Sequence, residues 1–191
     1  MEPRQDLSRW YVESAPMIDL LEVQPDDLSG DLATGVHRLL RDAFPEDGPH
    51  EGDYYRALGA PEVAIVLRDG PQVVGHLGLY TREVKIGNEV LEIGMLGGIV
   101  VAPDRRRQGH GRVLVRHAHE LLKERRIPFS ILFAWEPRIY EGSGYKLMQN
   151  QIRFLDSDGA WKTFVYQGGM YAELMGTPWP NQAIDLCGPV V

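Results

Sequence analysis

One stretch of the sequence decides the fold: residues Gly97–Arg112, GGIVVAPDRRRQGHGR. Its first half is apolar and ends at a proline, a pattern that predicts a β-strand which pairs no further. Its second half carries arginines and two glycines ahead of an amphipathic stretch, which predicts a turn that opens a helix. Glycine has no Cβ and the positive end of a helix dipole faces such a turn, so backbone N–H groups can converge there on an anion. The stretch therefore predicts an anion site at the start of a helix.

Charge is distributed unevenly along the chain. The 191 residues include 20 basic and 27 acidic side chains, a formal net charge of −7. Residues 104–126 hold eight basic and three acidic side chains, a net charge of +5, so the remainder carries −12. The acidic total argues against a general nucleic-acid binder or a polybasic membrane-surface protein, and we expect neither partner. Solvated arginines at a helix start are the alternative for the basic stretch, but a positive patch on an acidic protein favours a specific anionic ligand.

The remaining composition predicts a soluble, cytoplasmic protein. Cys187 is the single cysteine, so neither an internal disulfide nor a thiolate metal cluster can form, and we expect no bound metal. No apolar run is typical of a signal peptide or of a membrane-spanning helix. His117 and His119 are two residues apart on a predicted helix and face different directions, which excludes a metal pair and favours surface positions. His76, inside a predicted strand, favours a packed histidine with satisfied hydrogen bonds.

Periodicity and turn chemistry predict the order of the remaining elements. Strands are expected at 14–23, 63–67, 73–85, 90–101, 129–135, 145–155 and 163–174, helices at 32–43 and within 105–126, an acidic aromatic loop or short helix at 46–60, and one or two helical turns at 137–143. Gly94, Gly97 and Gly98 lie inside the strand at 90–101, and glycines inside a strand mark bulges or a close backbone approach. This order predicts a mixed α/β (α+β) layer rather than an alternating doubly wound fold.

Three phosphate-binding templates compete for the basic turn, and their spacing separates them. A dinucleotide fingerprint would need a third glycine where this chain has Leu114, and the Gly-Lys-Ser/Thr of a P-loop is absent. The third template is Arg or Gln, two residues, Gly, one residue, and Gly or Ala, and Arg106–Gly111 matches it directly after an apolar strand. In this motif the chain resembles the GNAT superfamily of acyl-CoA-dependent N-acyltransferases.

The resemblance implies a fold and a division of the chain. It implies the GNAT fold, with a central, mostly antiparallel sheet, a bulged and splayed strand, and flanking helices. The chain would be a single domain, 1–191, with its core at about 15–150 and a C-terminal arm at about 151–191. Acetyl-CoA is the implied donor. Its pantetheine arm would bind the backbone of Ile99, Val100 and Val101. Its pyrophosphate would lie on the turn, whose residues are Arg106, Arg107, Gln108, Gly109, His110, Gly111 and Arg112.

Tyr140 matches the family tyrosine that protonates the departing CoA thiolate. A phenol near the sulfur can act as a general acid, because it stays protonated at neutral pH. The alternative is a half-buried tyrosine that only packs. Ile139 stands where the family usually has an aromatic residue.

The general base is open among three candidates. Glu92 lies on the bulged strand and is the first candidate, although a solvent-exposed strand-edge glutamate is the alternative. Glu136 follows the next strand, and the terminal carboxylate of Val191 would reach the site if residues 185–191 fold back. The layout resembles aminoglycoside 2′-N-acetyltransferases, but these carry a glutamate where this chain has Gly97, which argues against an aminoglycoside acceptor.

These observations predict an acetyl-CoA-dependent N-acetyltransferase that acylates a primary amine of a small molecule or peptide in a ternary complex. Transfer of a longer acyl chain to an amino sugar is one alternative, since the strands near 75–82 and 92–101 resemble the nodulation N-acyltransferase. A non-catalytic CoA-binding regulatory domain is another, because no base is obvious. Tyr54, Tyr55 and Trp135 could line an acceptor pocket. A homodimer is compatible with the sequence.

Overall fold

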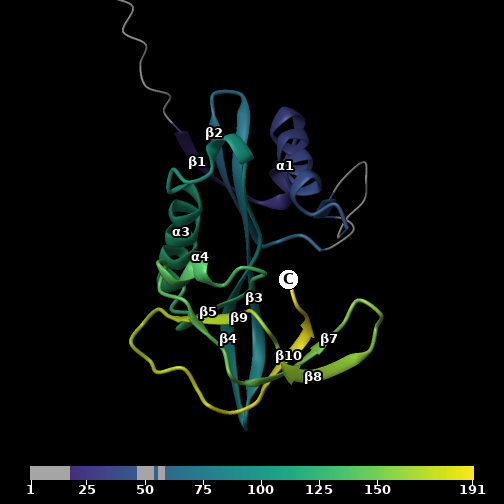
Figure 1. Ribbon diagram of the computed structural model, residues 1–191, viewed down its shortest axis with the longest axis vertical. Coiled ribbons are helices and arrows are strands. Elements are labelled where there is room, and N and C mark those ends of the chain that lie inside the picture. Colours follow the sequence, from purple (N-terminus) through teal and green to yellow (C-terminus); the bar gives the residue numbers. More distant parts are fainter. Residues whose placement is uncertain (1–17, 47–53, 56–58) are drawn as a thin grey trace, which may run out of the picture.

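The computed structural model describes residues 18–46, 54–55 and 59–191. Two long paired strands, β3 (Gln72–Ile86) and β4 (Glu89–Val101), run through the middle of the molecule (Figure 1). The strands are β1 (Ile18–Val23), β2 (Val63–Asp69), β3 (Gln72–Ile86), β4 (Glu89–Val101), β5 (Phe129–Phe133), β6 (Lys146–Leu147), β7 (Gln151–Leu155), β8 (Trp161–Val165), β9 (Gly169–Glu173) and β10 (Ile184–Pro189). The α-helices are α1 (Gly30–Ala43), α3 (His110–Glu124) and α4 (Arg138–Glu141).

The strands pair in one mixed sheet, mostly antiparallel. The path runs β6-β9-β5-β4-β3-β10-β7-β8, and β2 joins β1 to β3. Among the strand pairs that the structure describes, two are parallel, β4 with β5 and β10 with β7. The expected mixed α/β architecture with a largely antiparallel sheet is confirmed. Long stretches of β2 and β3 are buried, because both faces of the sheet are covered at this level.

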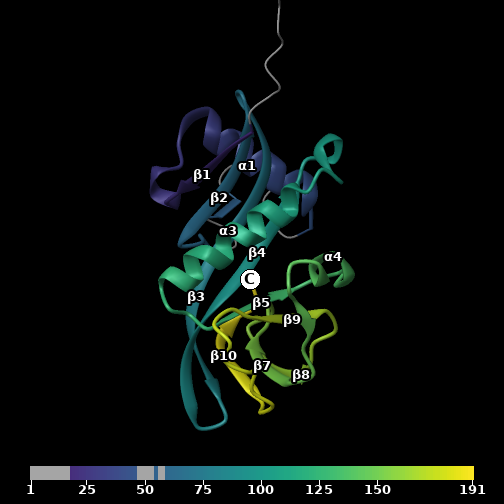
Figure 2. The ribbon, with the colours of Figure 1, turned by 90° about the vertical axis from the view of Figure 1, so that its left-hand side faces the viewer.

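Helices α1 and α3 lie on opposite faces of the β2–β4 sheet (Figures 1 and 2). Each presents one apolar stripe to the strands, as an amphipathic helix does. The buried residues are Gly35, Val36, Leu39 and Leu40 on α1, and Leu114, Val115, Ala118, His119 and Leu122 on α3. The two helices thus cover the part of the sheet that carries residues 97–101.

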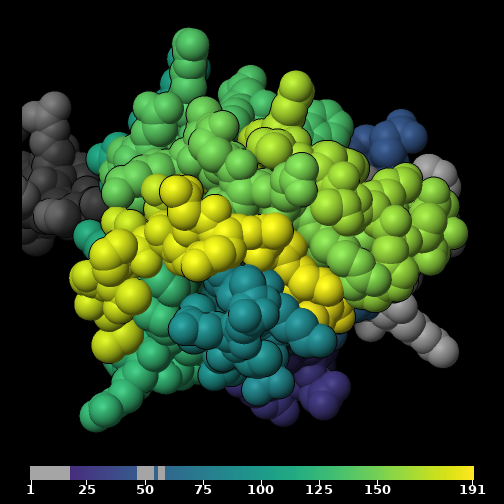
Figure 3. All heavy atoms as spheres, turned by 90° about the horizontal axis from the view of Figure 1, so that it is seen from below, coloured from purple at the N-terminus to yellow at the C-terminus, as the bar shows by residue number. Residues whose placement is uncertain are grey.

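The C-terminal arm covers the other half of the sheet. Its strands β7 and β10 pack a second apolar cluster against β3, β4 and β5. Figure 3 shows the C-terminal residues lying beside the tip of the β3–β4 hairpin, where Ile184 pairs with Ile86. The chain then runs back to the middle of the molecule, where Figure 1 marks the C-terminus.

The C-terminal part of the chain, from residue 145 onward, holds more strands than its sequence indicates. The two strands expected at 145–155 and 163–174 are four short ones, β6 to β9, and β10 is added. That expectation was wrong because the apolar runs are interrupted by tertiary contacts. The Asn150 amide donates to the carbonyls of Pro180 and Gln182, and Gly168 turns the chain with φ +83°.

The other expected elements match those of the structure to within a few residues. The strand expected at 14–23 is described from Ile18 onward. Residues 47–53 and 56–58 of the loop expected at 46–60 lie outside the described residues, and Tyr54 and Tyr55 between them are buried. Among the helices that the structure describes, none combines the length and the apolar character needed to cross a bilayer.

Candidate active site

Strand β4 carries a bulge at Gly98 and Ile99. Gly97 pairs with Gly78 and Val100 pairs with His76, so three steps along β4 match two steps along β3. One extra residue on one strand is the definition of a β-bulge. Gly98 adopts φ +56°, a left-handed conformation that costs glycine little. The bulge predicted from the glycines is confirmed.

Strands β4 and β5 separate at the level of the bulge. Their parallel pairing covers only Gly94–Leu96 with Ser130–Leu132. Beyond it, the backbone N–H of Ala134 turns to another partner and donates to the carbonyl of Gly168 at 2.9 Å. The strands therefore form a wedge at residues 97–101, which leaves room for a ligand that pairs with the β4 backbone.

The turn between β4 and α3 has the backbone expected of an anion site. Arg107 and Gly109 take φ values of 62° and 86°, and Gly109 is the N-cap of a 15-residue helix. Alternation of right- and left-handed residues turns successive N–H groups to one side. Nothing lies within 4 Å of the position that a Cβ on Gly109 would occupy, so the concave side of the turn is open.

The arginines of this turn divide into anchored and free ones. Arg105 pairs with Asp69 at 2.6 Å, and the Nε of Arg106 donates to the carbonyl of Val101 at 3.1 Å. The Gln108 amide donates to the Asp104 carbonyl at 3.4 Å. These contacts hold the shape of the turn, and the exposed Arg107 projects from it.

His110 and Arg112 complete the turn. The Nε2 atom of His110 is buried without a hydrogen-bond partner among the described residues, and a buried polar atom left unpaired is costly unless a ligand meets it. The Arg112 guanidinium lies against Gly142, within 2.9 Å of the position a Cβ there would take. The residues of the turn therefore fit a phosphate-bearing ligand that would lie between α3 and α4.

Tyr140 lies on α4, on the same side as this turn. It is half-buried, and its burial raises the pKa of its phenol. Its ring meets that of Tyr145 edge-on at 6.2 Å between centroids. The phenol therefore stays protonated throughout the neutral range, as a general acid must.

A buried polar cluster supports Tyr145. The hydroxyl of Tyr145 lies 2.6 Å from Ser130 Oγ and 3.0 Å from His119 Nε2. His119 is 8% exposed, so its expected surface position was wrong. Its place four residues after the buried Val115 puts it on the inner face of α3, and that spacing was the sequence signal. His117 is on the outer side, where it pairs with Glu22 at 2.7 Å.

His76 is packed and satisfied, as expected. Its Nδ1 lies 2.7 Å from the carbonyl oxygen of Gly98, and its Nε2 lies 2.5 Å from the hydroxyl of Tyr55. Burial, opposed by the Gly98 hydrogen bond, lowers its pKa to about 4. The imidazole is neutral at physiological pH.

A profile of the acetyltransferase (GNAT) domain matches residues 26–148. The chain belongs to this family. The match begins before α1 and ends just after β6, so it includes the bulge, the turn of residues 106–112 (the anion turn) and Tyr140. The GNAT assignment made from the motif at residues 106–111 is confirmed.

Two curated relatives match part of this GNAT chain. N-acetyltransferase Eis of Mycobacterium tuberculosis is 34% identical over 104 residues, which are 51% of this chain and 26% of Eis. Nodulation protein A of a Mesorhizobium species is 29% identical over 82 residues, 43% of this chain and 41% of that protein. The chain spans about a quarter of the length of Eis.

Two solved GNAT structures superpose on most of the chain. A GNAT family acetyltransferase of Brucella melitensis, solved with acetyl-CoA, has a TM-score of 0.59 at 19% identity and covers 89% of this chain and 96% of its own. The GNAT family N-acetyltransferase YhbS of Escherichia coli, solved with CoA, has a TM-score of 0.62 at 18% identity and covers 93% of both chains. At this identity the likeness establishes the GNAT fold.

The structure separates the three candidate bases of this GNAT domain. Glu92 is exposed and faces Glu83 across the hairpin. It lies five residues before Gly97, about 16 Å along the strand, and the fold does not bring it to the bulge. Glu136 is exposed in the turn before α4. Val191 lies at the bulge, since a Cβ on Gly97 would stand 3.0 Å from its carbonyl carbon.

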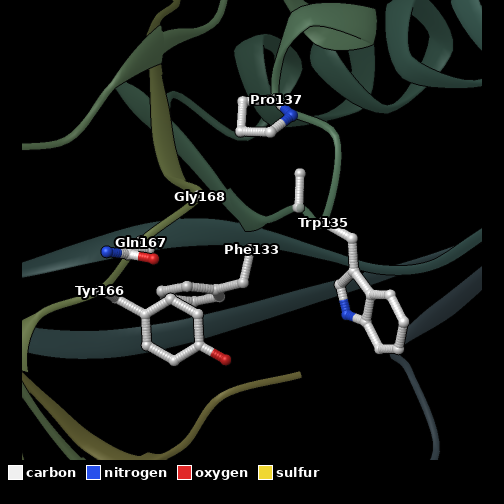
Figure 4. Close-up of a pocket in the computed structure, with 7 residues that line it drawn as sticks. Phe133, Trp135, Pro137, Tyr166, Gln167 and Gly168 are labelled. Atoms are coloured by element: carbon white, nitrogen blue, oxygen red, sulfur yellow. The ribbon is translucent and has the colours of Figure 1, made fainter.

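A cavity of about 420 Å³ opens at the end of β5 in the GNAT core (Figure 4). Its aromatic lining comes from Phe133, Trp135 and Tyr166. Trp135 is 96% exposed beside this cavity, and aromatic side chains commonly line ligand pockets. Phe133 is the next residue after Leu132, which pairs with Leu96 of β4. The cavity therefore lies at the level of Gly97, directly before the bulge.

Proposed function

We propose that this chain is an acetyl-CoA-dependent N-acetyltransferase that acts on a primary amine of a small molecule or peptide. The observation that carries the proposal is the wedge between β4 and β5 at residues 97–101, with the anion turn of α3 at one end and Tyr140 beside it. Acetyl-CoA would pair with the backbone of Ile99–Val101 and lay its pyrophosphate on residues 106–112.

Direct transfer follows from this placement. The neutral amine nitrogen attacks the thioester carbonyl carbon, and the oxyanion that forms is stabilised by backbone N–H groups of the bulge. The C–S bond then breaks, its electron pair goes to sulfur, and the Tyr140 hydroxyl donates a proton to the thiolate. The amide and free CoA leave, and Tyr140 regains a proton from water.

The attacking amine must lose a proton, and we propose that a carboxylate or a water molecule near the bulge accepts it. Of the three candidate positions, Val191 is the one whose main chain touches Gly97. The same contact explains Gly97, because a side chain there would occupy the space taken by Val191 and by the Tyr80 ring, 3.3 Å away. Glu92 and Glu136 are the side-chain carboxylates proposed for this role, and Glu92, about 16 Å from Gly97 along β4, would act only through intervening water.

The acceptor would enter from the face that carries α1 and the C-terminal arm. We propose the aromatic cavity near Trp135 as its binding place. The acidic charge outside residues 104–126 favours an approaching cationic amine. We also propose a single domain, a cytoplasmic location and, as one assembly, a homodimer.

Transfer of a longer acyl chain to an amino sugar is the second candidate. The match to nodulation protein A and the cavity of about 420 Å³ beside the bulge favour it, because an acyl chain could fill that cavity. Competing acetyl-CoA and octanoyl-CoA with one panel of amines, polyamines, amino sugars and peptides separates the two. Higher kcat/KM for the longer donor would replace the first proposal.

The test of the chemistry is Tyr140→Phe. Because only the proton donor is removed, kcat should fall about 100-fold while calorimetric affinity for acetyl-CoA is kept. Tyr171→Phe is the matched control, since Tyr171 is also partly buried but lies on β9 stacked on Trp179, and its kcat should not change. Acetyl-CoA binding without turnover for any amine would instead support the non-catalytic CoA-binding domain.

A further inference from the structure

His76 holds the bulge of β4 through one main-chain atom. It is 1% exposed and lies on β3 opposite Val100. Its two ring nitrogens contact the Gly98 carbonyl at 2.7 Å and the Tyr55 hydroxyl at 2.5 Å. The imidazole therefore joins the bulge to Tyr55, which lies 21 positions before His76 in the sequence.

The two partners decide which ring nitrogen carries the proton. A carbonyl oxygen only accepts, so Nδ1 must donate to Gly98. In a neutral imidazole the other nitrogen then accepts, so the Tyr55 hydroxyl donates to Nε2. Tyr55 also meets the ring of His37 on α1 edge-on, with centroids 5.4 Å apart. The tautomer and the ring orientation of His76 are thus set from both sides.

A hydrogen bond to the Gly98 carbonyl determines the direction of the next N–H. The peptide unit is planar and trans, so the N–H of Ile99 points opposite to the C=O of Gly98. Gly98 has φ +56°, a region in which glycine has several accessible orientations. His76 selects one of them and turns the Ile99 N–H away from the imidazole.

We propose that His76 is a positioning residue, which orients the Ile99 N–H for the carbonyl oxygen of a bound thioester by holding the carbonyl of Gly98. The inference rests on the proposed function, which places the acyl group at the bulge. His76 itself touches no reacting atom, and its effect passes through a single peptide plane. Tyr55 keeps the imidazole in the donating tautomer.

The packing around Gly98 favours this role over simple core filling. A Cβ on Gly98 would stand 3.3 Å from the His76 ring and 3.2 Å from Leu40, so the ring approaches the backbone more closely than a side chain at 98 would allow. A leucine at position 76 could fill the apolar space but would leave the carbonyl of Gly98 without its donor, and the peptide would be free to turn.

Two substitutions separate positioning from packing. His76→Asn keeps an N–H near the place of Nδ1, whereas His76→Leu keeps volume and removes the donor. We expect His76→Leu to lower kcat about 10–100-fold, less than the loss of a whole oxyanion donor, with little change in the KM for the amine. His76→Asn should stay close to the wild type. Val84→Ala, buried farther along β3, is the control for lost stability.

A second readout does not need activity. In the free protein, amide hydrogen exchange at Ile99 should become faster in His76→Leu than in His76→Asn or Val84→Ala, because the peptide plane is released. The positioning role is overturned if both His76 variants lose kcat equally. It is also overturned if neither variant changes the rate of amide exchange at Ile99. If the wild type transfers no acyl group at all, the proposed function fails, and the exchange experiment still decides what His76 holds.

Discussion

Tyr145 links three elements around the residue proposed as the general acid. Its hydroxyl lies within hydrogen-bond distance of Ser130 on β5 and His119 on α3, and its ring packs on Tyr140 of α4. Its pKa is raised well above the ordinary value by burial, against the hydrogen bond from Ser130. The hydrogen bonds of the Tyr145 hydroxyl thus hold in place the ring against which Tyr140 packs.

Tyr145→Phe should cost about 1–3 kcal/mol of folding free energy, because it leaves two buried polar groups without a partner. The catalytic rate should also fall, since the ring of Tyr140 loses a fixed neighbour. Urea unfolding and kcat measure the two effects. Ser130→Ala in the Tyr145→Phe background is the control, and the double variant should lose less than the sum of the single ones. Additive losses would contradict a shared cluster.

At the scale of elements, the end of β5 and the β8–β9 loop meet at Gly168. A Cβ on Gly168 would clash with the carbonyl oxygen of Ala134, and the φ of Gly168 is +83°. Both residues line the aromatic cavity. The close approach of two backbones, which only glycine permits, therefore shapes the wall of the proposed acceptor site.

Gly168→Ala should lower stability by more than the roughly 1–2 kcal/mol that a left-handed alanine costs, because the clash is added. It should also raise the KM for the amine while leaving the affinity for acetyl-CoA unchanged. Gly176→Ala isolates the conformational cost, since Gly176 has φ +75° and open space where a Cβ would be. Equal stability losses in the two variants would show that the close approach has no effect.

The response of the whole molecule to acid follows from two buried histidines. Burial is the main cause that lowers the pKa of both His76 and His119 to about 4, from 6.5. The unfolded chain therefore binds more protons than the folded protein between these values. The stabilisation from each neutral imidazole is complete above pH 6.5 and is lost as the pH falls towards 4.

The free energy of unfolding, obtained from urea titrations between pH 7 and pH 4, should fall with pH. The fall is of order 3 kcal/mol for each histidine as an upper value. His119→Asn removes one of the two groups, so its stability should depend less steeply on pH in this window. Asp185 and Glu173 have lowered pKa values, and their contribution is lost at lower pH. A stability that stays constant from pH 6.5 to pH 4 would contradict the buried neutral state.

Sequence reasoning located the local features of the proposed site. The glycines at 94, 97 and 98 predicted the bulge, and the arginines and glycines of residues 106–112 predicted the turn at the start of α3. These features depend on backbone conformation within a few residues, which residue type largely controls. Glu92 was selected by its strand alone, and strand membership does not state the distance to the bulge.

Sequence patterns alone predicted the order of the main elements, the bulge, the turn at the start of α3 and the family. The contacts between distant residues are seen only in the folded chain: Val191 meets Gly97, His76 meets both Tyr55 and Gly98, and Tyr145 meets both Ser130 and His119. Such contacts depend on strand register and on how the arm folds back, and a one-residue slip would turn each side chain to the other face of the sheet. Local sequence patterns do not predict these contacts, because the packing of the whole chain determines them.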